Sequence, residues 1–229
     1  MPENEKLVQN LSKSNTAFAP KPGCAVLPKS RLSLWAAVLT LIGALGLLGY
    51  RLVDPINFSF SWEYFTSFSR GLELLEALAL LTVSILLFTT RASGRNLKTP
   101  SLIWGVGTLF MLPAAIYGFV QTLRQYDLLM AYYILLIYAI PVAAAVFAIL
   151  YAFNALKKRP VLIIIGVLLG AVFIAGTYSH IIALSAYTNY PISPFDPLYI
   201  RFGFILLYYL LFPTGMFLAF LASKPKAAE

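Results

Sequence analysis

Among the ionisable side chains inside or at the ends of the long apolar stretches of this chain, four could do chemistry together. Glu73 and Glu76 lie three residues apart, whereas His180, the only histidine, and Arg201 lie in two later stretches. A carboxylate and an imidazole held together in an apolar environment can bind a cation, hydrogen-bond a solute or carry a proton. These residues are therefore the first candidates for a binding site.

Each candidate also has a structural alternative. Glu73 and Arg201 can extend toward the membrane interface, and Glu73 can pair with Arg70 three residues earlier. His180 can be a structural histidine with a satisfied hydrogen bond. Glu76 has the fewest alternatives, because its side chain is short and lies deeper in its apolar stretch. We therefore expect Glu76 to be the central residue of any site.

The composition predicts which kind of secondary structure positions these residues. Hydrophobic residues make up 60% of the 229 residues, charged residues only 11%, and the mean hydropathy is +0.80. This composition excludes a water-soluble globular domain. Continuous apolar runs, rather than alternating ones, predict an all-α polytopic integral membrane protein, a six-transmembrane-helix bundle. The predicted spans are 32–53, 71–90, 101–122, 128–153, 160–187 and 198–222.

Charge placement predicts the orientation and the domain organisation. Only four of the 17 Lys and Arg residues, Arg51, Arg70, Arg124 and Arg201, fall on one side of the predicted bundle, which leaves 13 on the other. The positive-inside rule then places the N-terminus and the C-terminus in the cytoplasm. We expect a flexible cytoplasmic tail at 1–31, the transmembrane domain at 32–222 and a short cytoplasmic tail at 223–229.

Depth and helical phase suggest which side chains meet. At the rise of an α-helix, Glu76 and His180 are both roughly 9–10 Å below the outer ends of their helices, and Glu73 and Arg201 about 5 Å. The spacing predicts two layers, Glu76 with His180 below and Glu73 with Arg201 above. On the second helix, Glu73 and Glu76 share a face with positions 77, 80 and 84. Aromatic side chains at similar depth that could complete an outward-facing polar pocket include Tyr117, Tyr133 and Tyr178.

Small residues and prolines predict how the helices pack. Gly166 and Gly170 form a G-x-x-x-G pattern in the fifth span, and the fourth is rich in alanine from 143 to 152, so we expect these two helices to pack closely. Dimerisation through the same glycines is the alternative. Pro113, Pro141 and Pro213 fall near the middle of their spans and are expected to kink them, either as static bends or as functional hinges.

The residue types in the sequence limit the cofactors, reactions and partners that we expect. One histidine cannot provide a bis-histidine haem or an H-E-x-x-H zinc site, so we expect no metal and no cofactor. Nucleophile motifs are absent from the sequence, so an enzyme is the less favoured class. The net charge of +8 is distributed between the apolar runs and not along one basic face, which argues against a nucleic-acid partner.

Three functions remain open at the level of the sequence. The first is a small-molecule binding or transport component with an outward-facing polar pocket, with proton coupling as an option. The second is a non-catalytic structural or assembly subunit of a larger membrane complex, and the third is an intramembrane lipid-modifying enzyme. The expected partners are the lipid bilayer, other membrane subunits and a small-molecule ligand. The first apolar run is longer than that of a cleavable signal peptide, so we expect it to be retained as a membrane anchor. This anchor and the strong cationic asymmetry favour a bacterial inner (plasma) membrane.

The predicted layout also resembles that of a known family. Six helices, both ends inside and an outer pocket are similar to the substrate-binding components of energy-coupling vitamin transporters. The similarity concerns the layout alone and assigns no ligand.

Overall fold

The computed structural model describes residues 30–52, 68–93, 96–125, 128–155, 158–187 and 197–223, and these residues are almost entirely helical. The aromatic segment between the first two spans lies mostly outside the described residues, as do the two tails apart from residues 30, 31 and 223. The helices in chain order are α2 (Arg31–Leu52), α4 (Phe68–Ser93), α5 (Lys98–Leu109), α6 (Leu112–Gln125), α7 (Leu128–Phe153), α8 (Lys158–Tyr187) and α9 (Pro197–Ala222).

Four stretches of these helices are long and apolar enough to cross a membrane, namely Arg31–Leu52, Gly71–Arg91, Pro160–Ile182 and Tyr199–Ala222. Within α7, Tyr138–Phe153 forms a shorter apolar stretch. The all-helical character and the apolar spans agree with the prediction and indicate a membrane protein. Their bounds differ from the predicted ones by a few residues at most.

The predicted third span is not one continuous helix, because it is divided into two short helices. α5 has 12 residues and α6 has 14, and each is shorter than a membrane crossing requires. At the junction, the Phe110 and Met111 amides donate to the carbonyls of Gly107 and Thr108, three residues back, which tightens the end of α5. Pro113 is the second residue of α6 rather than a mid-helix kink, and this early position is where proline is tolerated. By contrast, Pro141 and Pro213 do lie inside α7 and α9.

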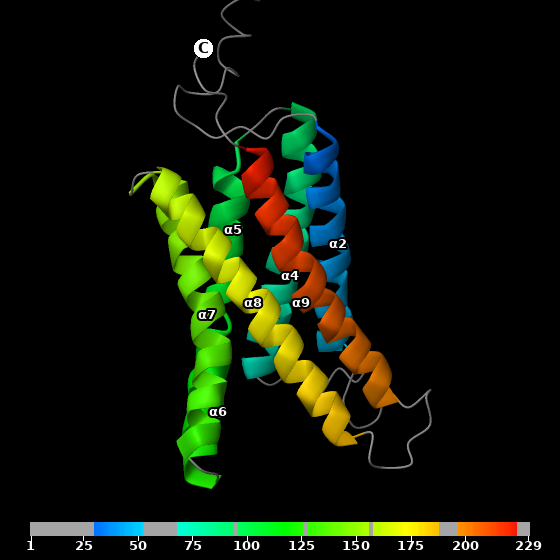
Figure 1. The fold of residues 1–229 in the computed structure, drawn as a ribbon, viewed down its shortest axis with the longest axis vertical. Helices are drawn as coiled ribbons and strands as arrows, with labels where there is room; N and C mark the ends of the chain where they lie inside the picture. The colour runs from blue at the N-terminus through cyan, green and yellow to red at the C-terminus, as the bar shows by residue number, and fades with distance from the viewer. Residues whose placement is uncertain are drawn as a thin grey trace, which may run out of the picture.

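The closest helix pair is α2 with α9, which lie side by side (Figure 1). A Cβ atom added to Gly43 would lie 2.5 Å from the Phe212 backbone nitrogen, and one added to Gly215 would lie 2.6 Å from the Thr40 nitrogen. No larger side chain fits at either position without moving a backbone. Because lipid provides no hydrophobic drive between helices, such close backbone contact is the main source of cohesion in a membrane bundle.

The alanine-rich face of α7 packs mainly against α5 and not against the glycines of α8. Ala144, Ala145 and Ala148 are fully buried, and a Cβ added to Gly105 would lie 2.8 Å from the Ala145 carbonyl oxygen. α7 and α8 do contact each other. The predicted packing of these two helices is thus present, but Gly170 does not mediate it, because a Cβ on this residue would meet nothing within 4 Å.

The arrangement of the helices places the functional candidates at one end of the bundle. α2 and α4 are antiparallel neighbours, α8 crosses the others obliquely, and the α6–α7 pair extends beyond them (Figure 1). The start of α2 and the end of α9 lie at the same end of the bundle (Figure 1). The end of α2, the beginning of α4 and the beginning of α9 therefore meet at the opposite end, and these three segments carry Arg51, Glu73, Glu76 and Arg201.

Candidate functional site

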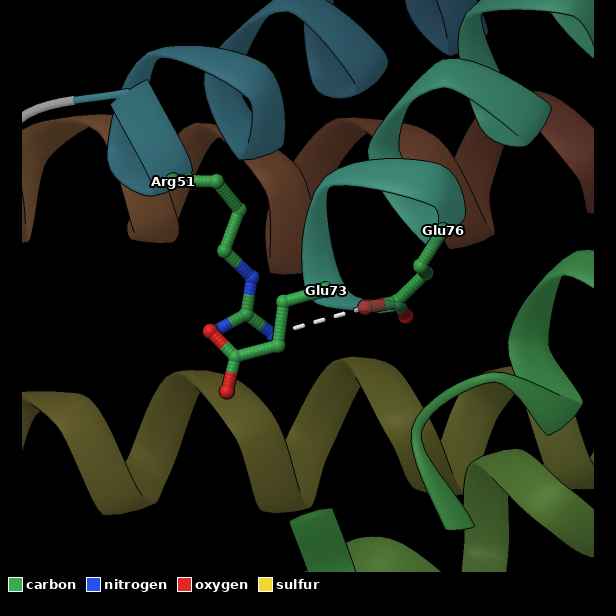
Figure 2. A network of polar contacts seen from close by, with 3 residues as sticks. All are labelled: Arg51, Glu73 and Glu76. Carbon is green, nitrogen blue, oxygen red and sulfur yellow. Dashed lines mark hydrogen bonds and ion pairs between the residues drawn. The ribbon is translucent and has the colours of Figure 1, made fainter. Parts of the chain in front are cut away.

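An arginine with two carboxylates forms the centre of the site. The Arg51 guanidinium donates through Nη1 to Glu73 Oε2 at 3.1 Å and through Nη2 to Glu76 Oε2 at 3.4 Å. Figure 2 shows the arginine extending from α2 toward both glutamates of α4. The Arg51 and Glu73 side chains are only 14% and 15% exposed, and Glu76 is fully buried. We call Arg51, Glu73 and Glu76 the ion cluster.

Local structure explains why these groups meet. Arg51 lies in the last turn of α2, where the helix dipole favours a positive charge, and its long side chain reaches sideways to α4. On α4, Glu76 and Ala77 are fully buried, and so are Leu80 and Ser84, about one and two turns further along the helix. This is the predicted inward face, so the helical phase read from the sequence is confirmed.

The ion cluster is not fully satisfied. Glu76 Oε1 and Arg51 Nε are buried and have no hydrogen-bond partner among the described residues. A buried polar atom without a partner costs roughly 1–3 kcal/mol, and more when it carries charge. An unfilled acceptor on a fully buried carboxylate can therefore take a proton, a water molecule or a donor group of a ligand.

His180 belongs to a neighbouring aromatic group and not to the ion cluster. Its Nδ1 lies 2.8 Å from the Gly176 carbonyl oxygen, and because a carbonyl only accepts, Nδ1 carries the proton. The ring packs against Tyr209 with centroids 4.9 Å apart, and Tyr209 fills the space that a side chain on Gly176 would need. Within the described part of the chain, the predicted direct pairing of His180 with Glu76 is not found, because Arg51 binds Glu76 instead.

Tyr209 connects the two groups. Its ring contacts His180, and its hydroxyl lies within electrostatic range of Arg51, Glu76 and Tyr138. Glu76 and His180, which the sequence analysis placed at one level, are thus both near this buried tyrosine. They lie in one polar and aromatic region of the bundle rather than in direct contact.

Arg201 also differs from the prediction. Its guanidinium carbon lies 4.3 Å from the centroid of the Tyr50 ring, a cation–π contact between the first turns of α9 and the end of α2. Arg51 lies 5.3 Å from the same ring on its own helix. Arg51 binds Glu73 and lies by the same Tyr50 ring as Arg201, so Arg51 is a member of this layer that the prediction did not include.

The predicted tyrosine lining is partly wrong. Tyr178 is 62% exposed on the outside of α8, so it does not line an interior pocket with Glu76. Tyr117 and Tyr133 belong to α6 and α7, but their side chains lie outside the described part of the structure. The tyrosines that do lie near the ion cluster are Tyr50, Tyr138, Tyr208 and Tyr209.

Sequence reasoning missed Arg51, which it had counted among the outer-loop charges. The signal was available, because Arg51 lies two residues before the end of the predicted first span. Glu73 lies about as far inside the beginning of the next span. Opposite charges at matched depth on consecutive antiparallel helices are natural partners in an apolar medium.

Ser179 and His180 do not form a pair of nucleophile and general base. Ser179 donates to the Gly176 carbonyl at 2.9 Å, and its contact with His180 is to the protonated Nδ1, which cannot remove the serine proton. No group of three His, Cys, Asp or Glu side chains that could hold a metal ion occurs within the described ranges. Proton exchange and ligand binding are the chemistry that the ion cluster itself can perform.

Comparison with known protein families, with curated protein sequences and with solved structures finds no match for this chain.

Proposed function

We propose that this protein is a membrane component that binds or transports a small molecule, with Glu76 as the residue that engages the solute or its coupled proton. The observation that carries the proposal is the state of the Glu76 carboxylate. It is fully buried, Arg51 holds one of its oxygens, and the other oxygen has no partner within the described part of the chain.

Energetics supports a functional reading over a purely structural one. A charged side chain within a span costs about 2.5–3.5 kcal/mol on insertion scales, and an apolar residue at position 76 would avoid that cost. A buried ion pair adds little net stability compared with apolar packing. Retaining a carboxylate with one open oxygen is therefore better explained by a ligand or a proton than by stability.

The proposal includes a topology. Four apolar spans and α7 account for five crossings, and α5 with α6 together would supply the sixth as a broken helix. Broken helices are tolerated in membranes where they line a cavity, and they are frequent in transporters. With both termini cytoplasmic, the ion cluster faces the outer side. A bacterial plasma membrane fits the charge asymmetry.

The experiment is a cryo-EM map of the full-length protein extracted with its native lipid in polymer nanodiscs. We expect the map to show non-protein density or an ordered water chain in contact with the Glu76 carboxylate. In the Glu76→Gln variant, this density should be lost or displaced. Mass spectrometry of the same preparation would identify a copurified solute. A map in which side chains of this or another polypeptide fill the open oxygen would refute the proposal.

A second function, as an assembly subunit of a larger complex, is favoured by a separate observation. Two adjoining apolar grooves of about 480 and 240 Å³ run between α8 and α9, and both include Gly166 and Phe217. Gly170, which lines the smaller groove, is exposed and has open space around it. The same nanodisc preparation tests this alternative, because a partner helix seated along α8 would be visible in the map.

A further inference from the structure

The end of the bundle opposite the ion cluster carries cations without counter-charges among the described residues. The beginning of α2, the end of α4, the beginning of α5 and the end of α9 lie at this end (Figure 1). The charged side chains described there are Arg31, Arg91 and Lys98. The acidic residues of the described ranges, Glu73 and Glu76, both belong to the ion cluster. An anion that balances these cations therefore comes from outside the described residues.

Arg91 is the most strongly held of these cations. It lies in the last turn of α4 and is partly buried. Its Nε atom is buried without a hydrogen-bond partner, and no carboxylate within the described ranges pairs with its guanidinium. A guanidinium has five N–H donors whose geometry fits the oxygens of carboxylates and phosphates. The exposed part of Arg91 is thus a charged donor whose acceptor the described residues do not supply.

The turn between α4 and α5 gives Lys98 a fixed position. The Lys98 amide donates to Asn96 Oδ1 at 3.1 Å, and the Ser101 amide donates to the Leu97 carbonyl at 2.9 Å. Leu97 is fully buried and belongs to the hydrophobic core, so the turn is anchored in the bundle. Lys98 therefore begins α5 at a defined place next to the end of α4.

The packing of α4 on α5 brings Arg91 and Lys98 to nearly the same height. A Cβ on Gly107 would lie 2.5 Å from the Cβ of Ala79, so these two residues face each other across the pair. The helices are antiparallel neighbours. Twelve residues from that contact, Arg91 is level with position 95, which is about one helical turn from Lys98.

The spacing along α4 places Arg91 at the depth of lipid phosphates. The 18 residues from Glu73 to Arg91 rise about 27 Å, which is close to the roughly 30 Å thickness of a hydrocarbon core. With the ion cluster near one boundary of the bilayer, Arg91 is near the other. Phosphate groups of the lipids lie at that level, which favours a lipid over a soluble anion as the source of the counter-charge.

We propose that Arg91 and Lys98 bind the phosphate group of an anionic phospholipid in the leaflet at this end of the bundle. The guanidinium supplies paired N–H donors for the phosphate oxygens, and the Lys98 ammonium adds a second charge. An anionic lipid is favoured over a zwitterionic one, because the described residues at this end include no carboxylate for a choline ammonium. This inference is independent of the proposed function, because it involves neither Glu76 nor the solute.

Native mass spectrometry of the full-length protein can measure the binding of single lipids. The probes are palmitoyl-oleoyl-phosphatidylglycerol and palmitoyl-oleoyl-phosphatidylcholine, which share their acyl chains and their phosphate and differ in net charge. We expect the first phosphatidylglycerol to bind at least about fivefold more tightly, because one cation near a lipid surface contributes roughly this factor. Glycerol phosphate, which has the phosphate without the acyl chains, should not displace the lipid at equal concentration.

Substitutions locate the site. Arg91→Gln should remove most of the preference for phosphatidylglycerol, and Arg91→Lys should retain part of it, because the charge stays while the paired donors are lost. Lys98→Gln should cause a smaller loss. The matched control is Arg124→Gln, which removes one exposed cation at the end of α6, away from the α4–α5 turn, and should leave the preference unchanged. Size-exclusion chromatography and helical circular dichroism check that each variant is folded. If Arg91→Gln does not fold, Arg91→Lys and Lys98→Gln still test the site.

Equal affinity of the two lipids for the unaltered protein would overturn this inference. So would a preference that survives in the double variant Arg91→Gln with Lys98→Gln. An equal loss in Arg124→Gln would show that the preference reflects overall charge and not this site. Displacement of the lipid by glycerol phosphate would assign the phosphate site to a soluble anion and refute the lipid. Each of these results leaves the open oxygen of Glu76, and with it the proposed function, unaffected.

Discussion

At the scale of single residues, Arg51 determines how the buried carboxylates are tolerated. It binds both Glu73 and Glu76, although the sequence analysis counted it only among the charges on one side of the bundle. Buried ion pairs contribute little net stability, but an isolated buried charge is expensive. The ion cluster should therefore behave as a unit, in which the removal of one partner costs more than the removal of two.

We expect Arg51→Met to destabilise the protein strongly, by about 3–5 kcal/mol, because the fully buried Glu76 then has no counter-charge. The double variant Arg51→Met with Glu76→Gln should recover part of that loss. The measurement is the midpoint of thermal unfolding in detergent, followed by size-exclusion chromatography. An apolar replacement of the exposed Arg124 is the control and should leave the midpoint in place. Equal losses in the single and double variants would show that Glu76 is not compensated by Arg51.

The candidate residues could be found from the sequence because polar groups are rare in apolar spans, but their partners could not. Depth counting placed Glu76 and His180 at one level, and both do lie near Tyr209. It could not show that Glu76 pairs with an arginine side chain and not with His180. Nor could it show that His180 is held by the carbonyl of its own helix turn.

At the scale of the elements, glycines determine which helices come together. Three glycines on α2, at 43, 46 and 49, lie against α9, and each would place a Cβ within about 3 Å of it. The sequence analysis concentrated on Gly166 and Gly170 instead, which line an open groove. A small-residue pattern therefore predicts that another helix can approach closely. Which helix does so depends on how all the helices pack together.

Gly43→Ala should weaken the α2–α9 pair, because its new methyl group would overlap the backbone of Phe212. Overpacking of this kind costs about 1–3 kcal/mol. Gly203→Ala is the matched control on α9, since a Cβ there meets nothing within 4 Å. The two variants are compared by the SDS concentration at which helical circular dichroism is lost. A midpoint for Gly43→Ala that equals that of Gly203→Ala would contradict the close contact.

The divided helix shows a limit of pattern reading. Hydropathy is continuous across 101–122, so the sequence offered no gap, and Pro113 was interpreted as a kink. The structure places the interruption at Phe110 and Met111 and lets Pro113 start a new helix. Hydropathy reports the medium around a segment and not the continuity of its hydrogen bonds.

At the scale of the whole molecule, the beginning of α2 and the end of α9, the first and last described helices, lie at the same end of the bundle (Figure 1). This arrangement agrees with an even number of crossings. The proposed function includes a prediction of the side of the membrane on which those ends lie. Chemical labelling of the single cysteine, Cys24, can test that prediction.

We expect Cys24 to be protected from a membrane-impermeant maleimide in intact cells and to react after the membrane is permeabilised. The reason is that 13 of the 17 cationic residues lie on the predicted cytoplasmic side together with the N-terminal tail. Ala227→Cys in a Cys24→Ser background should give the same result for the C-terminus. Labelling of either cysteine in intact cells would reverse the orientation or change the number of crossings.

The sequence by itself determined the medium, the helical class, most helix bounds and the buried face of α4. These follow from local composition and from the helical period, which depend only on neighbouring residues. Only the tertiary structure decided that Arg51 binds both glutamates, that the His180 ring packs against Tyr209 and that α5 and α6 are separate helices. Such pairings join residues far apart in the chain, and their energies depend on competition among all partners within reach, which a linear pattern does not encode.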